Sequence, residues 1–301
     1  SPSPSSNNNP LLIAMSNNIQ TLNNVAQSYY DSDDAFNFYQ QVWGGSFIHV
    51  GIYEPKTNPN DDDILEAIKK ASHESSIHLF NLSKPLSTSS MVMDMGSGYG
   101  GNARLCHSLF GSMVVCIDLS RKENAVNISL NESLGVSDRV VVPGERSFFD
   151  TKEPDSSFDL VVSMDSFLHA GSQRSLAVRE AARVLKKGGQ LIFTDIMQSD
   201  NANVNELSGV YKRIHLEDMG SPLRYKQWAE ESGLKLLEFE DKTQNIGIHY
   251  SCIKSLLEKR KDSLTNISSS YIENMIVGLD AWIDGTSKNN LAWGYFVFEK
   301  L

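Results

Sequence analysis

Short apolar runs alternate with amphipathic segments between residues 90 and 196. Such runs are typical of buried strands, and segments with apolar positions three or four apart are typical of helices. We expect strands near 91–95, 112–117, 139–142, 158–163 and 190–195, and helices near 101–110, 121–134 and 174–186. Strands that alternate with helices in this way predict a parallel, doubly wound α/β sheet.

The pattern changes after residue 196. A long insert, about 197–285, precedes an aromatic run at 293–298 that we interpret as the last strand. Within the insert we expect a strand near 234–239 and helices near 225–232, 250–261 and 270–284. The complete sheet would then have seven strands, mostly parallel, with helices on both faces, and the insert would form a lid over a bound substrate.

We place the sheet domain at 89–301. The chain before it divides into two segments. Residues 29–88 predict a helical layer, since the acidic run 61–63 can cap a helix with one apolar face. That face consists of Ile64, Leu65, Ile68, Ala71 and Leu79. The chain opens with Ser, Pro and Asn, which offer too little apolar area for ordering. We therefore expect 1–28 to be a disordered or poorly ordered arm.

The composition limits the kinds of partner. The chain of 301 residues carries 27 basic and 37 acidic side chains, a formal net charge of -10. Nucleic acids and anionic membranes need a basic face, so we expect neither and infer a small-molecule ligand. No apolar run approaches the roughly 18–20 residues of a membrane span. The sequence is compatible with a homodimer and leaves the oligomeric state open.

The cysteines Cys106, Cys116 and Cys252 show no metal-ligand spacing. Two of them fall in expected core elements, which is typical of reduced, buried thiols and favours a cytoplasmic location. Acidic residues do not cluster as a divalent metal would require, and Ile196 follows Asp195 after the fifth strand. We therefore expect no metal ion in the site.

The segment after the first strand carries the main chemical signal. Asp94 precedes the glycines Gly96, Gly98 and Gly101, and Asp118 ends the next apolar run. An acid, a glycine turn, a helix and a second acid form a βαβ unit whose second carboxylate can bind ribose hydroxyls. A nicotinamide dinucleotide and S-adenosylmethionine (SAM) both satisfy these glycines. Asp94 favours SAM, because an acid there can attract its cationic methionine part but would repel a pyrophosphate.

This segment resembles motif I of the class I SAM-dependent methyltransferases, Asp-x-Gly-x-Gly-x-Gly, with its third glycine at Gly100. The resemblance implies a Rossmann-like fold, SAM as cofactor and S-adenosylhomocysteine as product. The turn 144–146 aligns with the family's Gly-Asp-Ala turn, which implies that Glu145 or Arg146 meets the adenine edge. The cofactor ligands implied in this way are Asp94, Gly96, Ser97, Gly98, Asp118, Leu119, Glu145 and Arg146.

Asp165 and His169 follow the fourth strand and are four residues apart. On a helix they would share one face, where the carboxylate could orient the imidazole as a general base. Alternatively, Asp165 caps the helix and His169 is an ordinary packed or surface histidine. The Asp-x-x-x-His spacing resembles the catalytic pair of phosphobase methyltransferases. We therefore assign both to catalysis, together with Tyr30, which is also a candidate cofactor ligand.

Aromatic residues are dense between 29 and 54. Aromatic faces stabilise methylammonium and sulfonium cations by roughly 0.5–2 kcal/mol each. An entry lid would use such residues, and we assign Tyr29, Trp43 and Tyr53 to substrate binding. The alternative is packing of a helical layer, which we prefer for Phe36 and Phe38.

The insert offers cations for a substrate carboxylate. The planar fork of arginine suits a carboxylate best, so Arg213 is a candidate, with Arg224 and Lys212 as alternatives. His249 and Tyr250, near the start of an expected helix, are candidates for the same pocket.

A second resemblance concerns the substrate. Trp43-Gly44-Gly45 and the stretch 48–54, together with 163–169, resemble the sarcosine and dimethylglycine N-methyltransferases. This resemblance extends from about residue 29 to 196. It implies methyl transfer to the amine nitrogen of sarcosine or dimethylglycine, towards glycine betaine. Phosphobase methyltransferases and the tocopherol and sterol methyltransferases share part of these motifs, so a phosphobase or a lipid ring carbon is the alternative acceptor.

Two other classes of protein are compatible with parts of the sequence. An NAD-dependent reductase needs Tyr-x-x-x-Lys, a spacing that Tyr250 and Lys254 satisfy, but this pair lies too late in the chain. A non-catalytic partner protein with this fold should have lost its cofactor residues, whereas both acids and the glycines of the motif are present. The sequence therefore predicts an enzyme.

Overall fold

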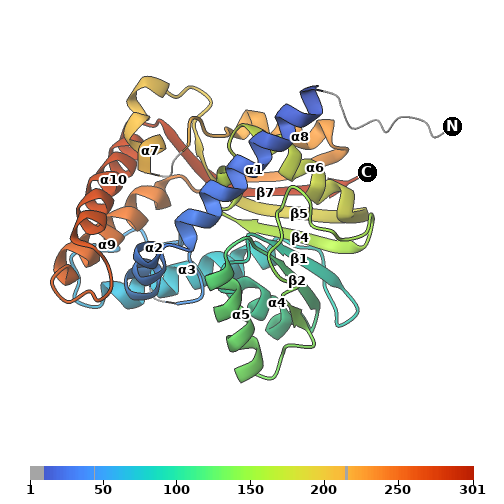
Figure 1. The fold of residues 1–301 in the computed structure, drawn as a ribbon, viewed down its shortest axis with the longest axis horizontal. Coiled ribbons are helices and arrows are strands. Elements are labelled where there is room, and N and C mark those ends of the chain that lie inside the picture. Colours follow the sequence, from blue (N-terminus) through green and yellow to red (C-terminus); the bar gives the residue numbers. More distant parts are fainter. Residues whose placement is uncertain (1–9, 44, 214–215) are drawn as a thin grey trace.

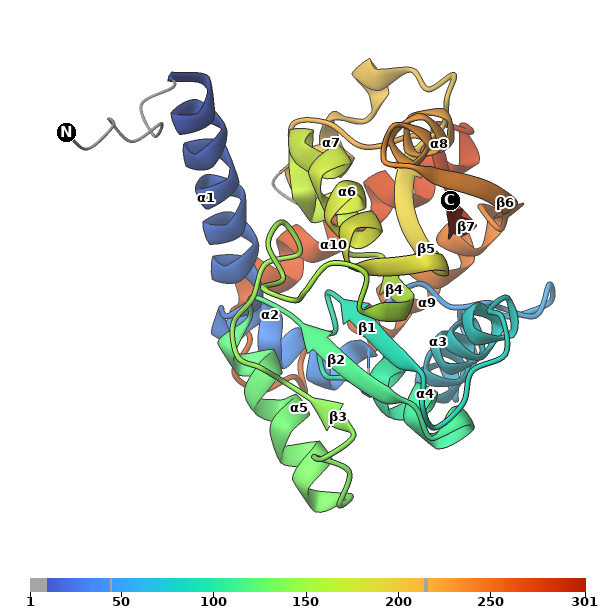
Figure 2. The same cartoon turned by 90° about the vertical axis from the view of Figure 1, so that its right-hand side faces the viewer.

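The computed structural model describes residues 10–43, 45–213 and 216–301, with the backbone alone at 10–15 and 213. Its centre is a seven-stranded sheet in the order β3-β2-β1-β4-β5-β7-β6. Figure 1 labels five of these strands, and Figure 2 also labels β3 and β6. β7 runs antiparallel to both of its neighbours, and the other strand pairs are parallel. The strands are β1 (Met91–Met95), β2 (Met113–Ile117), β3 (Val140–Val141), β4 (Phe158–Met164), β5 (Leu185–Gln198), β6 (Leu234–Asp241) and β7 (Leu291–Lys300). The predicted mostly parallel sheet is confirmed.

Helices cover both faces of the sheet, which explains why β1 and β4 consist mostly of apolar residues. One apolar cluster joins the sheet to α3 (Ile64–Asn81), α4 (Gly101–Phe110), α9 (Gln244–Arg260) and α10 (Ser269–Ser287). A second cluster joins the opposite face to α6 (Arg174–Val184) and α8 (Pro222–Glu231). α5 (Arg121–Ser133) lies beside α4, and its Asn127 accepts a hydrogen bond from Arg104 at 3.0 Å. The three cysteines are free and buried, as predicted.

The order of the strands determines where a ligand can bind. β1 lies between β2 and β4, so the direction in which strands are added reverses beside β1. Ligands of open α/β sheets bind at such a point, outside the carboxyl ends of the strands. The loops after β1, β2 and β4 therefore meet at one place on the sheet edge.

The N-terminal segment differs from the sequence prediction. Most of the expected arm, from Pro10 onward, belongs to the helix α1 (Pro10–Tyr30), and residues 1–9 lie outside the described residues. Figure 2 shows α1 along the edge of the molecule, with its first turns directed away from the sheet. Its second half contacts loops that are distant in sequence, including a hydrogen bond between Asn23 and Ser147 at 3.0 Å. The prediction relied on the composition of the first residues, which does not show contacts between residues that are distant in sequence.

The expected helical layer is only partly helical. It contains α2 (Asp33–Phe38), a π-helical turn η1 (Tyr39–Trp43) and α3, while the described residues between Gly45 and Asp63 form no helix. This irregular segment packs against the glycine turn, because a Cβ on Gly101 would lie 2.4 Å from the carbonyl oxygen of Ser46.

The helix expected near 174–186 is shorter than predicted. α6 ends at Val184, and the next residue is already extended. Gly188, at φ +77°, lies within β5.

The insert contributes to the sheet as well as to the region beside it. Its predicted strand and three helices are present as β6, α8, α9 and α10, and a short helix α7 (Ser208–Arg213) precedes them. Because β6 pairs with β7 and α8 packs on the sheet, only the remaining parts of the insert can form a lid. Within the described ranges, no helix is both long and apolar enough to cross a membrane.

Candidate active site

The glycine turn after β1 brings the backbone close to its neighbours. Gly96 has φ +77°, and a Cβ at this position would lie 2.2 Å from Ser166 Oγ. Gly98, at φ +50°, donates its N–H to Asp118 Oδ2 at 2.8 Å. Only glycine adopts such angles without strain. The turn therefore packs directly against the residues that follow β2 and β4. Together these three loops form one continuous surface, here called the wall.

A cavity, here called the first cavity, lies against this wall. Small-molecule sites of open α/β sheets are commonly found at this edge. The lining of the first cavity combines the glycine turn, the end of β2, the end of α1 and the loops after β3 and β4. Of the predicted cofactor residues, those on the lining are Tyr30, Gly96, Ser97, Gly98, Asp118, Leu119 and Arg146.

Asp118 is held in place by backbone donors. Gly98 N–H binds one carboxylate oxygen, and Ser120 N–H binds the other at 2.9 Å. Burial raises the pKa of Asp118, and these N–H donors oppose the rise. The carboxylate therefore faces the first cavity with a fixed orientation, as ribose recognition requires.

Asp94 lies behind the turn and not on the cavity lining. Neither of its oxygens accepts a hydrogen bond from a described residue. Burial, and secondarily Asp118, raises its pKa from 3.8 to about 7, while Arg104 opposes the rise. Ser97 Oγ, by contrast, lines the cavity and also has no partner within the described chain.

Of the two residues of the loop after β3 that were predicted at the adenine edge, only Arg146 lines the first cavity. Arg146 binds Glu153 at 2.6 Å. Glu145 is not on the lining; it binds Arg121 at 2.7 Å and Gln27 at 2.9 Å.

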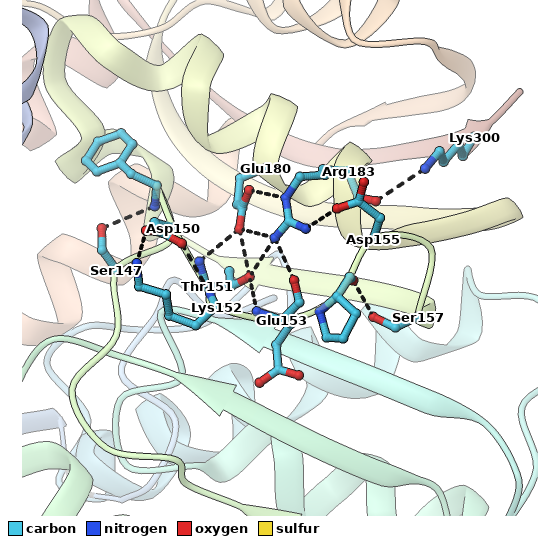
Figure 3. Close-up of polar contacts among 12 residues, drawn as sticks. Ser147, Asp150, Thr151, Lys152, Glu153, Asp155, Ser157, Glu180, Arg183 and Lys300 are labelled. Carbon is cyan, nitrogen blue, oxygen red and sulfur yellow. Dashed lines mark hydrogen bonds and ion pairs between the residues drawn. The ribbon is translucent and has the colours of Figure 1, made fainter. Parts of the chain in front are cut away.

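A polar cluster on α6 anchors that loop (Figure 3). Glu180 accepts hydrogen bonds from the backbone N–H and the hydroxyl of Thr151, at 2.8 and 2.7 Å. Arg183 binds Glu180 and donates to the carbonyl of Glu153 at 2.8 Å. These contacts fix the loop that presents Arg146 to the cavity.

A second cavity has six tyrosine and tryptophan side chains in its lining. Those side chains are Tyr29, Tyr30, Tyr39, Trp43, Tyr250 and Trp282. The two cavities share Tyr30, Ile48, His49, Asp165 and His169 in their linings, so they adjoin at this group of residues. We call this group the junction.

The predicted substrate residues fall into three groups. Tyr29, Trp43 and Tyr250 line the second cavity. Tyr53 and His249 do not line it; the Tyr53 hydroxyl binds His249 Nδ1 at 2.7 Å, and the His249 ring packs on Trp43 with centroids 4.9 Å apart. The side chain of Arg213 lies outside the described residues, and Arg224 is 53% exposed on the surface near Asp218.

The expected geometry of Asp165 and His169 is wrong, although both residues belong to the junction. Asp165 has φ +52° and precedes the 3-10 helix η2 (Phe167–Gln173), so the two side chains do not share one helix face. The Asp165 carboxylate accepts hydrogen bonds from Thr194 Oγ1 at 2.8 Å, Trp293 Nε1 at 2.7 Å and Val50 N–H at 2.8 Å. His169 Nε2 pairs with the Tyr30 hydroxyl at 2.9 Å.

Hydrogen bonds hold both the N–H and the carbonyl of Leu168, the residue before His169, and we call this arrangement the clamp. Asp195 accepts the N–H of Leu168 at 3.0 Å, and Arg174 donates to the carbonyl of Leu168 at 3.0 Å. Tyr225 in turn donates to Asp195 at 2.5 Å. This clamp holds the position of η2 relative to β5 and α6.

Sequence reasoning missed His49, which is 5% exposed and belongs to the junction. Its Nε2 pairs with Ser76 Oγ at 3.0 Å. Burial lowers the pKa of His49, and Asp165 opposes this. Its position within the stretch 48–54, which resembled a methyltransferase family, was the available signal. No sequence signal identified Thr194 and Trp293, because strand pairing brings them to Asp165.

With the geometry established, comparison with known proteins is informative. Residues 93–193 match the family model described as a methyltransferase domain. The sarcosine/dimethylglycine N-methyltransferase of Halorhodospira halochloris is 41% identical over 92% of this chain and 96% of its own length. The chain belongs to the sarcosine/dimethylglycine N-methyltransferase family. The dimethylglycine N-methyltransferase of Parasynechococcus marenigrum (strain WH8102) is 39% identical, over 92% of this chain and 95% of its own.

A solved structure agrees with this membership. The crystal structure of a protein from Galdieria sulphuraria, provisionally assigned as a sarcosine dimethylglycine methyltransferase, matches this chain with a TM-score of 0.79 and 32% identity. The match covers 89% of this chain and 98% of that one. As a member of the sarcosine/dimethylglycine N-methyltransferase family, this chain is a SAM-dependent methyltransferase. The reductase alternative is wrong, and Lys254, on which it depended, binds Asp280 at 2.7 Å away from both cavities.

Proposed function

We propose that this enzyme transfers methyl groups from SAM to the amine nitrogen of sarcosine and dimethylglycine, forming glycine betaine. The observation that carries the proposal is an aromatic cavity that adjoins the first cavity at Asp165, Tyr30 and His169. The relative from H. halochloris, whose name gives these two acceptors, matches this chain over nearly its full length.

The first cavity has the groups that SAM needs. Asp118 would accept the ribose hydroxyls, and Leu119 and Arg146 would lie at the adenine. Ser97 Oγ is a buried polar atom with no partner within the described chain, and Asp94 provides a carboxyl close behind the turn for the cationic methionine part. When bound, SAM supplies an electrophilic methyl group to the acceptor.

The second cavity suits an acceptor nitrogen that already carries methyl groups. Aromatic faces attract methylammonium cations by roughly 0.5–2 kcal/mol each, and six aromatic side chains line this cavity. At the junction, three donors hold the Asp165 carboxylate in place. Its charge would offset the positive charge that the nitrogen acquires as it is methylated.

The Tyr30–His169 pair can make the acceptor nucleophilic. An ammonium group must lose a proton before its nitrogen can attack. The Tyr30 hydroxyl oxygen can accept that proton while its own proton passes to His169 Nε2, 2.9 Å away. The step leaves a neutral amine, a neutral tyrosine and an imidazolium, and the clamp on Leu168 keeps the imidazole in place.

The test is methylation of a panel of acceptors: glycine, sarcosine, dimethylglycine, phosphoethanolamine and a tocopherol precursor. S-adenosylhomocysteine release and product mass are the readouts. We expect turnover of sarcosine and dimethylglycine, ending at glycine betaine. Turnover confined to the phosphobase or the ring acceptor would refute the proposed acceptor and leave the methyltransferase assignment intact.

A further inference from the structure

Glu123 is a buried acid on the wall of the first cavity that no step above uses. It lies in the first turn of α5, five residues after Asp118, and is 3% exposed. Its Oε2 lies 3.7 Å from the position of a Cβ on Gly98. The carboxyl group is therefore directed at the glycine turn and not at solvent.

An ordinary structural role for Glu123 would be a capping box. In the pattern Ser-x-x-Glu, the glutamate at the third helical position binds the backbone N–H of the capping serine. Ser120 does cap α5, since its Oγ accepts the N–H of Glu123 at 3.1 Å. The reciprocal bond is absent, because Ser120 N–H donates to Asp118 Oδ1 at 2.9 Å. Asp118 thus takes the role that would fix the Glu123 side chain.

No described residue replaces that partner. Among the described residues, no hydrogen bond and no cation reaches the Glu123 carboxyl; neighbouring Lys122 binds Asp33 instead. A buried acid without a donor or a cation is costly in its charged form. An unpartnered polar group on a cavity wall is a group available to a ligand.

Two of the titratable groups that face Glu123 favour its neutral form: Asp118 at the end of β2 and Asp31 after α1. The third, the buried Tyr99 of the glycine turn, is an uncharged phenol whose own pKa is raised. Burial raises the pKa of Glu123 well above its usual 4.5, and the charges of Asp118 and Asp31 act in the same direction. Asp118, in contrast, has two backbone donors that favour its ionised form.

We propose that Glu123 is a second ligand for the nucleoside of the cofactor: as a neutral acid it donates a hydrogen bond, while the Asp118 carboxylate accepts from the ribose hydroxyls. This inference rests on the placement of SAM in the first cavity proposed above. It makes cofactor binding dependent on one proton, because the ionised Glu123 has no hydrogen to donate and would repel Asp118.

The test is isothermal titration of the intact chain with S-adenosylhomocysteine between pH 6 and 9, in buffers of different ionisation enthalpy. Above the pH at which Glu123 ionises in the free protein, we expect the affinity to decrease with pH, with a limiting slope of about tenfold per pH unit. In that range, binding should take up about one proton. Glu123→Gln keeps a donor and cannot ionise, so its affinity should lose the part of the pH dependence that Glu123 causes. Any pH dependence that remains should follow other acids of the site, such as Asp94. Glu123→Ala should bind about five- to tenfold more weakly at pH 6. Glu132→Gln, an exposed change on the same helix, should behave as the unaltered chain.

The possible failures are distinguishable. If the unaltered chain takes up no proton, or if Glu123→Gln takes up as much as the unaltered chain, then Glu123 is not the proton-linked ligand. Uptake that persists in the variant would belong to another acid of the site, such as Asp94. If S-adenosylhomocysteine does not bind the unaltered chain at any pH, the placement of the cofactor itself is overturned.

Discussion

Asp94 carries a carboxyl group that the fold buries without giving it a hydrogen bond from the described chain. Its pKa is about 7 in the folded chain and close to the ordinary 3.8 in the unfolded chain. The unfolded chain therefore releases this proton first, and the cofactor-free protein loses stability as the pH rises from about 4 to about 7. We expect Asp94→Asn to raise the free energy of unfolding at pH 8 by on the order of 2–4 kcal/mol, and by less at pH 5.5.

Urea unfolding without cofactor at these two pH values measures the effect. Asp262→Asn, which alters an exposed acid after α9, is the matched control and should change stability at neither pH. An equal gain for Asp94→Asn at both pH values would contradict the assignment, because a pH-independent gain cannot come from a titrating carboxyl. The same variant should bind SAM more weakly, so stability and cofactor affinity should change in opposite directions.

His169 is the residue on which the proposed proton transfer depends. We expect His169→Ala to lower kcat about 10²- to 10⁴-fold at neutral pH, the usual contribution of a general base. The affinity for S-adenosylhomocysteine should change far less, and Tyr30→Phe should reduce kcat without abolishing it. Steady-state kinetics with dimethylglycine measures this. His107→Ala, which alters a histidine of α4 outside both cavities, is the control. A kcat for His169→Ala within a factor of a few of the control would refute the role.

Asp165 illustrates what sequence spacing can predict about a site. Both Asp165 and His169 follow β4 at the carboxyl edge of the sheet, and this position, which the sequence does indicate, brings both residues to the junction. The shared helix face that their spacing predicts is absent, because Asp165 adopts a left-handed backbone conformation before η2 begins. That conformation directs the carboxylate to Trp293, 128 positions away, and no local pattern encodes such a contact.

At the scale of elements, α1 acts as a cap on the first cavity. Gln27 on α1 donates to the carbonyl of Leu119 at 3.0 Å and to Glu145 at 2.9 Å, and Tyr30 reaches His169. We expect Gln27→Ala to accelerate dissociation of S-adenosylhomocysteine about three- to tenfold, since two hydrogen bonds that hold α1 are lost. Stopped-flow displacement measures this rate. Gln20→Ala, on the exposed part of the same helix, should leave it unchanged, and equal rates in both variants would count against the cap.

The elements of the sheet were predictable and those of the N-terminal segment were less so. Buried parallel strands such as β1 and β4 are distinct in sequence, because both of their faces are covered and most of their residues are apolar. α1 lacks such a signal, since its polar side chains find partners only after the loop at Ser147 and the end of β2 have been assembled. The irregular segment before α3 likewise depends on the glycine turn against which it packs.

At the scale of the whole molecule, the irregular N-terminal segment, the insert and the sheet are joined by direct hydrogen bonds. Tyr53 N–H binds Asn245 in α9 at 2.9 Å, and Val50 N–H binds Asp165 after β4. We therefore expect these parts to unfold in one cooperative transition. Hydrogen exchange followed by mass spectrometry at increasing urea should show peptides from α3, β1 and α10 opening at the same concentration. Earlier opening of α9 and α10, with the sheet still protected, would show that the insert is an independent unit.

The buried cysteines have a practical consequence. Only the thiolate reacts rapidly with maleimides, and burial raises the pKa of Cys106, and of Cys116 and Cys252 to about 12. The folded chain should therefore be almost inert to labelling without removal of any native residue. A cysteine introduced at the exposed Asn17 of α1 would be the single fast-reacting group, so a fluorophore placed there would report movement of the cap, molecule by molecule, during turnover.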